Sequence, residues 1–368
     1  MPEEKRYQIA LSLVPKVGPV ISRQLINHIG SAKDILNTSS GKLQKIEGVG
    51  PKLLELFRNT DSYLKRADSI LNDSSKKDIE VLFYKDTHYP QRLHQVPDAP
   101  LVLYKKGNGD INVSKTIAIV GTRKATKYGN QITDQLVGEA KALGVQIISG
   151  LAYGIDVRSH KAALTNDLET FGVLACGLDS VYPTRHLSTA KEMQAKGGLI
   201  SEYPIGTKAD ARFFPARNRI IAGLCDALIV VEAAKKGGAL ITANIAHSYE
   251  KPVYAVPGDL GNTYSEGCND LIRTLKAQIC TGFKDVVEGL NWDLVKEEKQ
   301  KEKAKQIKQL EGSEAKVVKI LFEHGQQMPL DQLSWKTQIP LNQLASVLLQ
   351  LEFQGLIKPL PGSEYKLV

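Results

Sequence analysis

The stretch T-I-A-I-V-G-T-R-K-A-T-K-Y-G, residues 116–129, decides the fold of this chain. Its first five residues are apolar or β-branched and run into Gly121, which predicts a short buried strand. Residues 128–143 then have the apolar spacing of a helix. A strand, a glycine turn and a helix start together favour an anion, because backbone N–H groups and the helix dipole point at the ligand.

A basic cluster follows this strand directly. Arg123, Lys124 and Lys127 come just after Gly121, and the guanidinium of Arg123 has the donor geometry that suits phosphate. The alternative interpretation is an ordinary connection between strand and helix with solvated lysines. Both interpretations stay open on this stretch alone.

Strand and helix patterns alternate along the next part of the chain. Apolar runs predict strands at 117–120, 145–149, 171–175, 198–201, 227–232 and 253–256, with helical patterns between them. This alternation predicts an α/β fold, a doubly wound parallel sheet with helices on both faces. Pieces at 81–84 and 101–104 are expected to add strands to the edge of this domain.

The predicted carboxyl ends of these strands carry glycine, basic and aromatic residues. In such sheets ligands bind at those ends. The candidate residues are Ser149 and Gly150, Tyr182 and Arg185, Phe214, Arg217, Asn218 and Arg219, and Gly237 and Gly238. A basic groove with aromatic rings is typical of single-strand binding, in which bases stack for roughly 1–3 kcal/mol each. The alternative for Tyr182 and Phe214 is packing beneath the loops.

Composition and missing motifs exclude several classes of protein. The net charge of +8 favours an acidic partner such as nucleic acid. The four cysteines are widely spaced, which predicts a reduced, cytoplasmic protein without a cysteine metal site. There is no apolar signal core and no run of ~18 apolar residues for a membrane span. Dinucleotide and P-loop signatures are also absent, so no cofactor is expected.

Few residues suggest catalysis. Asp156, Asp179 and Glu232 form a possible carboxylate set, but no nucleophile–base pair stands beside them. Asp179 and Glu232 are instead expected to order loops by accepting backbone N–H bonds. His160 and His186 are expected on a helix surface or at the rim rather than as metal ligands.

The sequence predicts four segments: a helical domain at 1–70, the α/β domain at 71–292, a charged linker at 293–312 and a small domain at 313–368. The first holds a repeat, V-P-K-V-G-P at 14–19 and I-E-G-V-G-P at 46–51. The second copy resembles a helix-hairpin-helix (SAM-like) motif, whose Gly-x-Gly turn exposes N–H groups to a DNA phosphate. Gly48, Gly50 and Lys52 match that use. Lys16 replaces the first of these glycines in the other copy. The alternative is that the glycines only allow tight turns.

The last segment resembles a winged helix. Helical patterns at 314–322, 330–335 and 341–353 precede strand-like ends at 357–360 and 365–368. Its reading helix, L-N-Q-L-A-S-V-L-L-Q-L-E-F, has no Lys or Arg, and the segment holds five basic and five acidic residues. Because groove binding needs phosphate contacts, we expect a protein-contact or dimerising role rather than duplex reading.

Several ordered motifs resemble the DNA-processing protein A family (DprA, also called Smf). They are G-T-R-K-A-T, S-G-L-A-Y-G-I-D, G-L-D-S-V-Y-P, F-P-A-R-N-R-I-I-A-G-L, G-G-A-L-I-T-A and V-P-G-D, which together cover most of residues 80–280. The resemblance implies an extended Rossmann-like domain that binds single-stranded DNA without sequence preference. It also implies a homodimer that loads the RecA recombinase during natural transformation and is not an enzyme.

The resemblance also assigns roles to residues. Arg123 resembles the main DNA-contacting arginine of the family, and Gly121, Thr122, Ser149 and Gly150 resemble its phosphate cradle. Arg217, Asn218 and Arg219 resemble its second basic motif, and Arg185 stands where a basic residue often lines the pocket. Residues 265–272 resemble a region near the self-association and RecA-facing surface.

Two other functions stay open. One is a Rossmann-like nucleotide phosphoribohydrolase, whose motif P-G-G-x-G-T-x-x-E carries a catalytic acid. Here the corresponding run reads K-K-G-G-A-L-I-T-A and lacks the final Glu. The other is a scaffold whose basic face contacts only acidic proteins.

Overall fold

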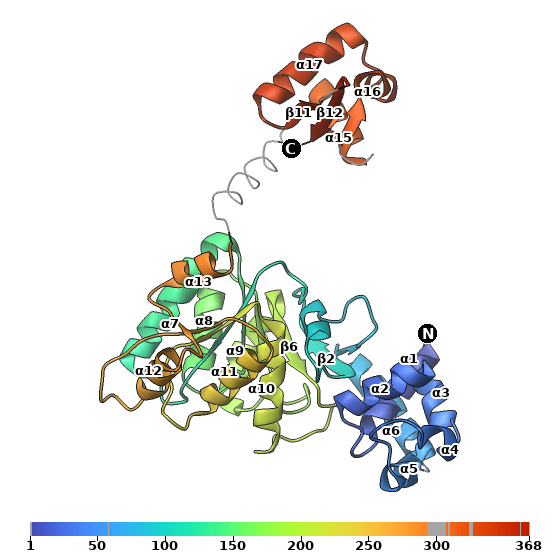
Figure 1. The fold of residues 1–368 in the computed structure, drawn as a ribbon, viewed down its shortest axis with the longest axis vertical. Coiled ribbons are helices and arrows are strands. Elements are labelled where there is room, and N and C mark those ends of the chain that lie inside the picture. The colour runs from blue at the N-terminus through green and yellow to red at the C-terminus, as the bar shows by residue number, and fades with distance from the viewer. Residues whose placement is uncertain are drawn as a thin grey trace. The chain divides into compact units, whose positions relative to one another are not determined.

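Strand β3 (Thr116–Val120) is fully buried at the centre of a nine-stranded sheet. In this computed structural model, drawn as a ribbon in Figure 1, the strand order is β1-β2-β6-β5-β4-β3-β7-β8-β9. Strands β3 to β9 pair in parallel, and β1 and β2 form an antiparallel hairpin on the edge beside β6. The structure describes residues 2–57, 59–292, 307, 310–323, 327–360 and 362–367.

The predicted doubly wound parallel sheet is confirmed. Its other strands are β1 (Glu80–Phe83), β2 (Val102–Lys106), β4 (Gln146–Ser149), β5 (Thr170–Val173), β6 (Gly198–Ser201), β7 (Ala227–Val230), β8 (Val253–Ala255) and β9 (Gln278–Ile279). Strand β9 was not predicted, because two residues are too few to show an apolar pattern.

The helices form a layer on each face of the sheet. Helices α7 (Lys127–Ala140), α8 (Ile155–Thr165) and α9 (Leu187–Lys196) follow β3, β4 and β5 and share one face, and α13 (Phe283–Gly289) packs on α7. Helices α10 (Phe213–Leu224), α11 (Gly238–Ser248) and α12 (Glu266–Arg273) share a core on the other face. Right-handed crossovers force this change of face where the strand order reverses beside β3. That reversal opens a crevice at the carboxyl end of β3.

The N-terminal helices pack against the β1–β2 edge of the sheet. They are α1 (Pro2–Leu13), α2 (Pro19–Ile29), α3 (Ala32–Asn37), α4 (Ser40–Leu43), α5 (Pro51–Phe57) and α6 (Thr60–Lys76). Ile9 and Ile70 belong to the same buried cluster as Phe83 and Tyr104. Residues 1–291 therefore form one compact unit.

The internal repeat produces two turns of the same kind. Gly48 has a φ of 85° and Lys16 has a φ of 66°, so both lie in the left-handed region. Each is followed by a buried valine, a glycine and a proline that begins a helix. Lys16 thus adopts a backbone conformation that normally favours glycine, and the substitution at this position leaves the turn intact.

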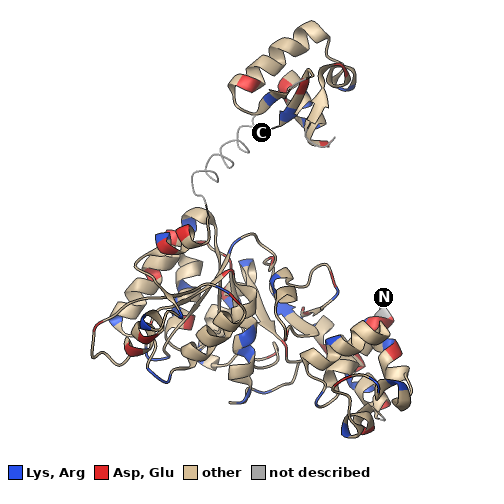
Figure 2. Cartoon of the chain, viewed as in Figure 1, with Lys and Arg blue, Asp and Glu red and all other residues tan. Residues whose placement is uncertain are grey.

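Residues 292–368 form a second compact unit, described by itself. It contains α15 (Gly312–Glu323), β10 (Gln327–Pro329), α16 (Leu330–Thr337), α17 (Leu341–Phe353), β11 (Ile357–Leu360) and β12 (Glu364–Leu367), with the strands ordered β10-β12-β11. The predicted winged helix is confirmed, with β10 as an additional short strand. Figure 2 shows no Lys or Arg on α17. Most of the predicted charged linker lies outside the described residues, and the division into four segments stays a prediction.

Candidate functional site

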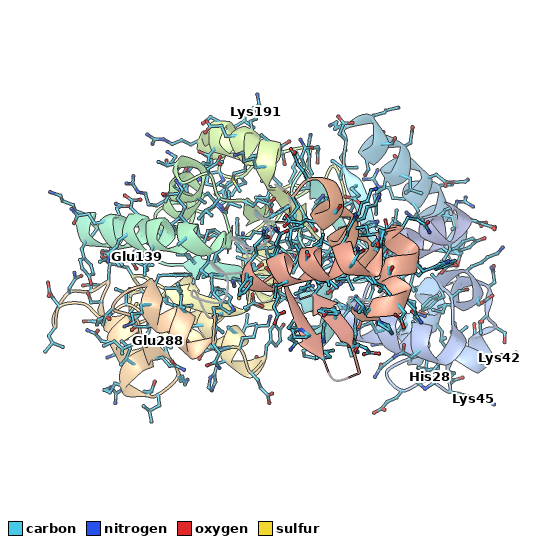
Figure 3. All side chains as sticks on the ribbon, turned by 90° about the horizontal axis from the view of Figure 1, so that it is seen from above. His28, Lys42, Lys45, Glu139, Lys191 and Glu288 are labelled. Atoms are coloured by element: carbon cyan, nitrogen blue, oxygen red, sulfur yellow. The ribbon has the colours of Figure 1, made fainter. Side chains whose placement is uncertain are left out.

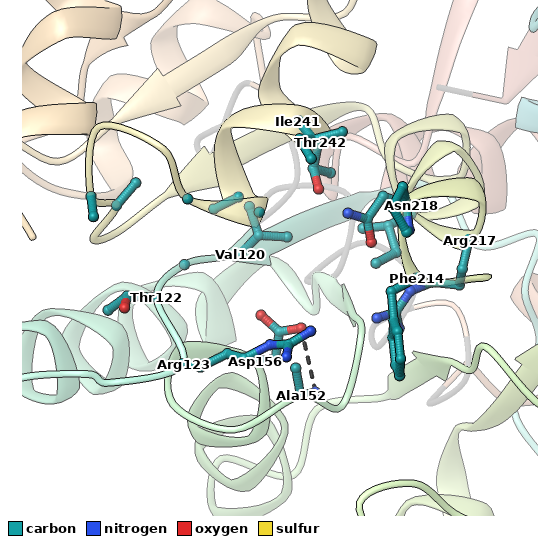
Figure 4. A pocket seen from close by; sticks show the side chains of 18 of the residues that line it. Val120, Thr122, Arg123, Ala152, Asp156, Phe214, Arg217, Asn218, Ile241 and Thr242 are labelled. Atoms are coloured by element: carbon teal, nitrogen blue, oxygen red, sulfur yellow. Dashed lines mark hydrogen bonds between the residues drawn. The ribbon is translucent and has the colours of Figure 1, made fainter. Parts of the chain in front are cut away.

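A cavity of about 670 Å³ lies at the carboxyl end of β3, where the strand order reverses. Its walls come from the loops after β3, β4 and β7 and from helices α10 and α11 (Figure 4). Nine of the thirteen residues predicted for the groove line it: Gly121, Thr122, Arg123, Tyr182, Phe214, Arg217, Asn218, Gly237 and Gly238. Turns that lie far apart in the sequence therefore meet at one site, as strand order requires.

Arg123 is the exposed cation of this cavity. Its guanidinium carbon lies 5.5 Å from the centre of the Phe214 ring, a cation–π distance. Among the described residues the Arg123 side chain forms no hydrogen bond or ion pair, so its five N–H donors remain available to a ligand. This geometry allows Arg123 to receive an anionic ligand.

Arg217 also lines the cavity, but its side chain is only 4 % exposed. Its Nη1 donates to the backbone carbonyls of Gly150, at 2.6 Å, and Val173. Burial lowers the pKa of Arg217 to about 10, an effect opposed by the nearby charge of Asp156. Arg217 thus borders the cavity as predicted, while its Nη1 joins the ends of β4 and β5, and its contact with DNA stays a prediction.

Asp156 is the buried counter-charge of Arg217. Its Oδ2 accepts the backbone N–H groups of Gly150, at 3.1 Å, and Ala152, at 3.4 Å. Burial raises the pKa of Asp156, and Arg217 opposes that shift. Because the Gly150 N–H group is already bonded, Gly150 does not offer it to a phosphate, contrary to the predicted cradle.

Three further predicted residues lie outside the lining of the cavity. The Ser149 hydroxyl is buried and donates to the Ile119 carbonyl at 2.6 Å, which ties β4 to β3. Arg219 pairs with Glu202 and donates to the Asp98 carbonyl at 2.8 Å. Arg185 is exposed in the turn before α9 but does not line the cavity. The structure therefore does not bring Ser149 and Arg219 into the cavity lining, because both side chains are bonded inside the protein, and their role in DNA binding stays a prediction.

The start of α7 is not the open anion site that the sequence suggested. The buried carboxylate of Glu232 accepts the Thr126 N–H group at 2.9 Å and the Thr126 hydroxyl at 2.6 Å. The Thr126 hydroxyl in turn accepts the Gly129 N–H group at 3.2 Å. The protein's own carboxylate thus takes the place of an external anion at this helix end.

The start of α11 has no such cap. Gly237 is its extended N-cap residue and provides no capping side chain, and both Gly237 and Gly238 line the cavity. The exposed residues Lys235 and Lys236 precede it. Here the helix dipole and the first N–H groups remain available to a ligand.

Two exposed tyrosines accompany Phe214 near this end of the sheet. Tyr182 is 50 % exposed, and its ring centre lies 5.6 Å from that of Phe214. Tyr182 is therefore not packed beneath the loops. Tyr153, which the sequence analysis did not single out, is 44 % exposed and packs edge-on against His186 at 4.9 Å. Its position could have marked Tyr153 as a candidate, because it is the one aromatic residue between Gly150 and Gly154 in the loop after a predicted strand.

The remaining acids and histidines have internal roles. The Asp179 carboxylate accepts the Gly206 N–H group at 2.9 Å, so the prediction that Asp179 and Glu232 order loops is confirmed. The predicted surface position of His160 and His186 is wrong, since both are buried. His186 Nδ1 lies 2.8 Å from the Leu151 carbonyl. In the part of the chain that the structure describes, no group of three metal-ligating side chains is placed to hold an ion.

The helix-hairpin-helix residues lie apart from the lining of this cavity. Gly50 and Lys52 flank the start of α5, and Lys52 is exposed. Lys42 and Lys45, which belong to the same helical domain, project outward in Figure 3. No helix among the described residues has the length and apolar character needed to cross a bilayer.

The fold and the cavity define a class of mixed α/β proteins that combine a Rossmann-like domain with an N-terminal helical domain and a C-terminal winged helix. Comparison with known families agrees with each part. The model of DNA recombination-mediator protein A matches residues 80–291, the DprA winged-helix domain matches 301–363, and a SAM-like helix-hairpin-helix tandem matches 9–56.

Relatives extend over most of the chain. Protein Smf of Synechocystis sp. is 31 % identical, covering 99 % of this chain and 98 % of its own, and DprA of Bacillus subtilis is 34 % identical over 75 % and 93 %. The X-ray structure of DprA from Streptococcus pneumoniae has a TM-score of 0.63 at 29 % identity, covering 78 % and 98 %. DprA from Helicobacter pylori, described for its single-stranded DNA binding mode, has a TM-score of 0.53 at 30 % identity, covering 58 % and 95 %. The chain belongs to the DNA recombination-mediator protein A family, known as DprA or Smf.

Proposed function

We propose that this protein binds single-stranded DNA at the cavity and acts as a recombination mediator that loads RecA on incoming DNA during natural transformation. The observation that carries the proposal is the unclaimed guanidinium of Arg123, which lies over Phe214 and beside the exposed Tyr182. Phosphates can pair with the cation while bases stack on the rings, without a readout of sequence. The single-strand binding described for the H. pylori relative supports the same function.

Loading of RecA can be tested by reconstitution. The protein should speed the assembly of RecA filaments on single strands that are covered by a single-strand-binding protein, and Arg123→Ala should abolish this effect. Lys191→Ala is the matched control, because Lys191 is an exposed cation that points away from the molecule in Figure 3. Equal stimulation by the wild type and Arg123→Ala would contradict the proposed role of the cavity.

We infer a homodimer from the edge of the sheet at β9. Leu260, Leu275 and Ile279 are 94 %, 89 % and 50 % exposed, and an unpaired edge strand readily pairs with another chain. This edge adjoins the segment 265–272, which forms most of α12 and packs Cys268 and Leu271 inward. Sedimentation should show a dimer that Ile279→Lys weakens; a wild-type monomer at all concentrations would refute this.

A catalytic role is not proposed. The candidate acids Asp156 and Glu232 are both bonded to backbone N–H groups, and the final glutamate of the phosphoribohydrolase motif is missing. Incubation with nucleoside monophosphates should release no free base.

We further propose Gly48, Gly50 and Lys52 as an auxiliary DNA contact, which Lys52→Glu should weaken without affecting the cavity.

A further inference from the structure

The second open edge of the sheet, at β1, carries a groove that the proposed functions do not use. Among the described strands β1 pairs only with β2, so its other side has no neighbouring strand. A groove of about 620 Å³ runs along this side, between β1 and the end of α6. Its lining shares no residue with the cavity beside Arg123. This surface is therefore separate from the proposed DNA site.

The backbone of β1 leaves one residue open on this edge. The Tyr84 N–H group donates to the Leu101 carbonyl at 3.0 Å. Because bonds alternate along an antiparallel pair, Phe83 and Val81 direct their N–H and C=O groups away from β2. Those of Phe83 are bonded to Asp86, whose carboxylate accepts the N–H group at 3.2 Å and whose own N–H group donates to the carbonyl at 2.7 Å. Val81 has no such partner among the described residues, which leaves a donor and an acceptor for another strand.

A buried hydroxyl also lines the groove without a partner. Ser74 of α6 is 1 % exposed, and its Oγ forms no hydrogen bond within the described part of the chain. A polar group at this depth normally has a partner. Leu71 and Val81, both partly exposed, add apolar surface to the same groove. An extended peptide backbone in the groove would supply the partner of Ser74 and cover this apolar surface.

The charges of the groove favour an acidic occupant. Lys5 and Lys85 line it, and neither is paired with a carboxylate among the described residues. Lys85 only approaches a backbone carbonyl, at 3.5 Å. Of the two acids in the lining, Glu80 pairs with Lys105 at 3.3 Å, and Asp86 is bonded to the turn after β1. Unpaired positive charge therefore remains for the carboxylates of a partner.

We propose that the groove binds an extended acidic segment of another protein as an additional strand beside β1. The backbone of this segment pairs with Val81 and with the hydroxyl of Ser74, while its carboxylates pair with Lys5 and Lys85. Strand addition of this kind draws its affinity from main-chain hydrogen bonds and its selectivity from alternate side chains. The protein can then hold a partner at the edge of the sheet while the cavity at β3 stays free for DNA.

The test uses the full chain and a short labelled peptide that alternates valine with aspartate. Fluorescence anisotropy should show that this peptide binds at least about tenfold more tightly than the same peptide with lysine in place of aspartate. Two further forms are N-methylated, either at every valine or at every aspartate. Since N–H groups alternate between the two edges of a strand, one form should lose binding and the other should keep it. Loss in both forms, or retention in both, would contradict strand pairing.

Four variants assign the binding to the groove. The double reversal Lys5→Glu with Lys85→Glu should abolish the preference for the acidic peptide, whereas Lys191→Glu, at an exposed lysine outside the groove, should retain it. Ser74→Ala should weaken peptide binding about three- to tenfold without lowering thermal stability, because the hydroxyl has no partner in the described protein. Arg123→Ala should bind the peptide as the wild type does.

No binding of the acidic peptide by the wild type would overturn the proposal, as would a preference that survives the reversal of both lysines. Displacement of the peptide by oligo-dT from the Arg123→Ala protein would assign the groove to nucleic acid instead. A dimer that the peptide dissociates in sedimentation would assign the edge to a second copy of the chain, which would also contradict the proposal.

Discussion

At the scale of single residues, the two arginines of the cavity have opposite roles. Arg123 is exposed and unclaimed, whereas Arg217 is buried and donates to two backbone carbonyls. As arginines, the two residues have the same side-chain chemistry in the sequence. Their difference arises from the fold, because the carbonyls of Gly150 and Val173 reach Arg217 only after β4 and β5 are paired.

Replacing Arg217 should therefore affect stability. Arg217→Met keeps the stem but leaves Asp156 buried without its counter-charge, and we expect a loss of about 3–5 kcal/mol in the free energy of unfolding. Urea denaturation measures this loss. Adding Asp156→Asn should recover part of it, and a loss below about 1 kcal/mol would contradict the structural role.

His160 makes the stability depend on pH. Its Nδ1 lies 2.7 Å from the hydroxyl of Thr170, which donates to the Ile147 carbonyl, so the ring is neutral and donates through Nδ1. Burial lowers the pKa of His160 from 6.5 to about 3. In the unfolded chain His160 is therefore protonated below about pH 6.5, whereas in the folded protein it stays neutral down to about pH 3. Stability from this group is complete above that range and is lost as the pH falls.

The measurement compares wild type with His160→Gln. The difference between their free energies of unfolding should shrink by about 2 kcal/mol between about pH 7.5 and about pH 5. Burial raises the pKa of Asp156, which gives the stability the opposite pH dependence. Because both proteins contain Asp156, its contribution cancels in the difference. A difference that does not change with pH would show that His160 accepts its proton in the folded protein.

At the scale of elements, the start of α7 depends on the neighbouring strand. Glu232 follows β7 and caps α7 through Thr126. A Cβ at Gly129 would come within 2.2 Å of Glu232 Oε2, whereas a Cβ at Gly138 in the same helix would meet nothing within 4 Å.

These two glycines form a matched pair. Glycine-to-alanine changes inside a helix usually stabilise by about 0.5–1 kcal/mol. We expect that gain for Gly138→Ala and a loss for Gly129→Ala, because the new methyl group displaces the capping carboxylate. Thermal unfolding of both variants checks this. A stabilised Gly129→Ala would mean that Glu232 does not cap the helix.

The helices and strands could be predicted from the sequence more fully than the contacts between side chains. The parallel strands and the winged-helix elements follow from local apolar patterns, and the family motifs located the cavity. The cap on α7 could not be predicted, since Glu232 approaches Thr126 only because β7 pairs with β3. Likewise, Asn218 and Thr242 line the same cavity because α10 packs on α11, which no single motif encodes.

At the scale of the whole molecule, DNA affinity should reside in residues 1–291. Residues 313–368 hold equal numbers of basic and acidic residues, and their helix α17 has no Lys or Arg. Deleting residues 313–368 should leave the affinity for single strands within about twofold of the wild type. Fluorescence anisotropy with labelled oligo-dT measures it, and a large loss would place a DNA contact in the winged helix.

The most direct test of the central claim is a titration of labelled oligo-dT at about 0.05 M and about 0.2 M salt, with wild type, Arg123→Ala and Lys191→Ala. Each phosphate neutralised on a single strand contributes about 0.7 to the slope of log affinity against log salt. We expect Arg123→Ala to weaken binding and to flatten that slope by about 0.7, while Lys191→Ala matches the wild type. Unchanged affinity and slope in Arg123→Ala would contradict the assignment of the cavity as the DNA site.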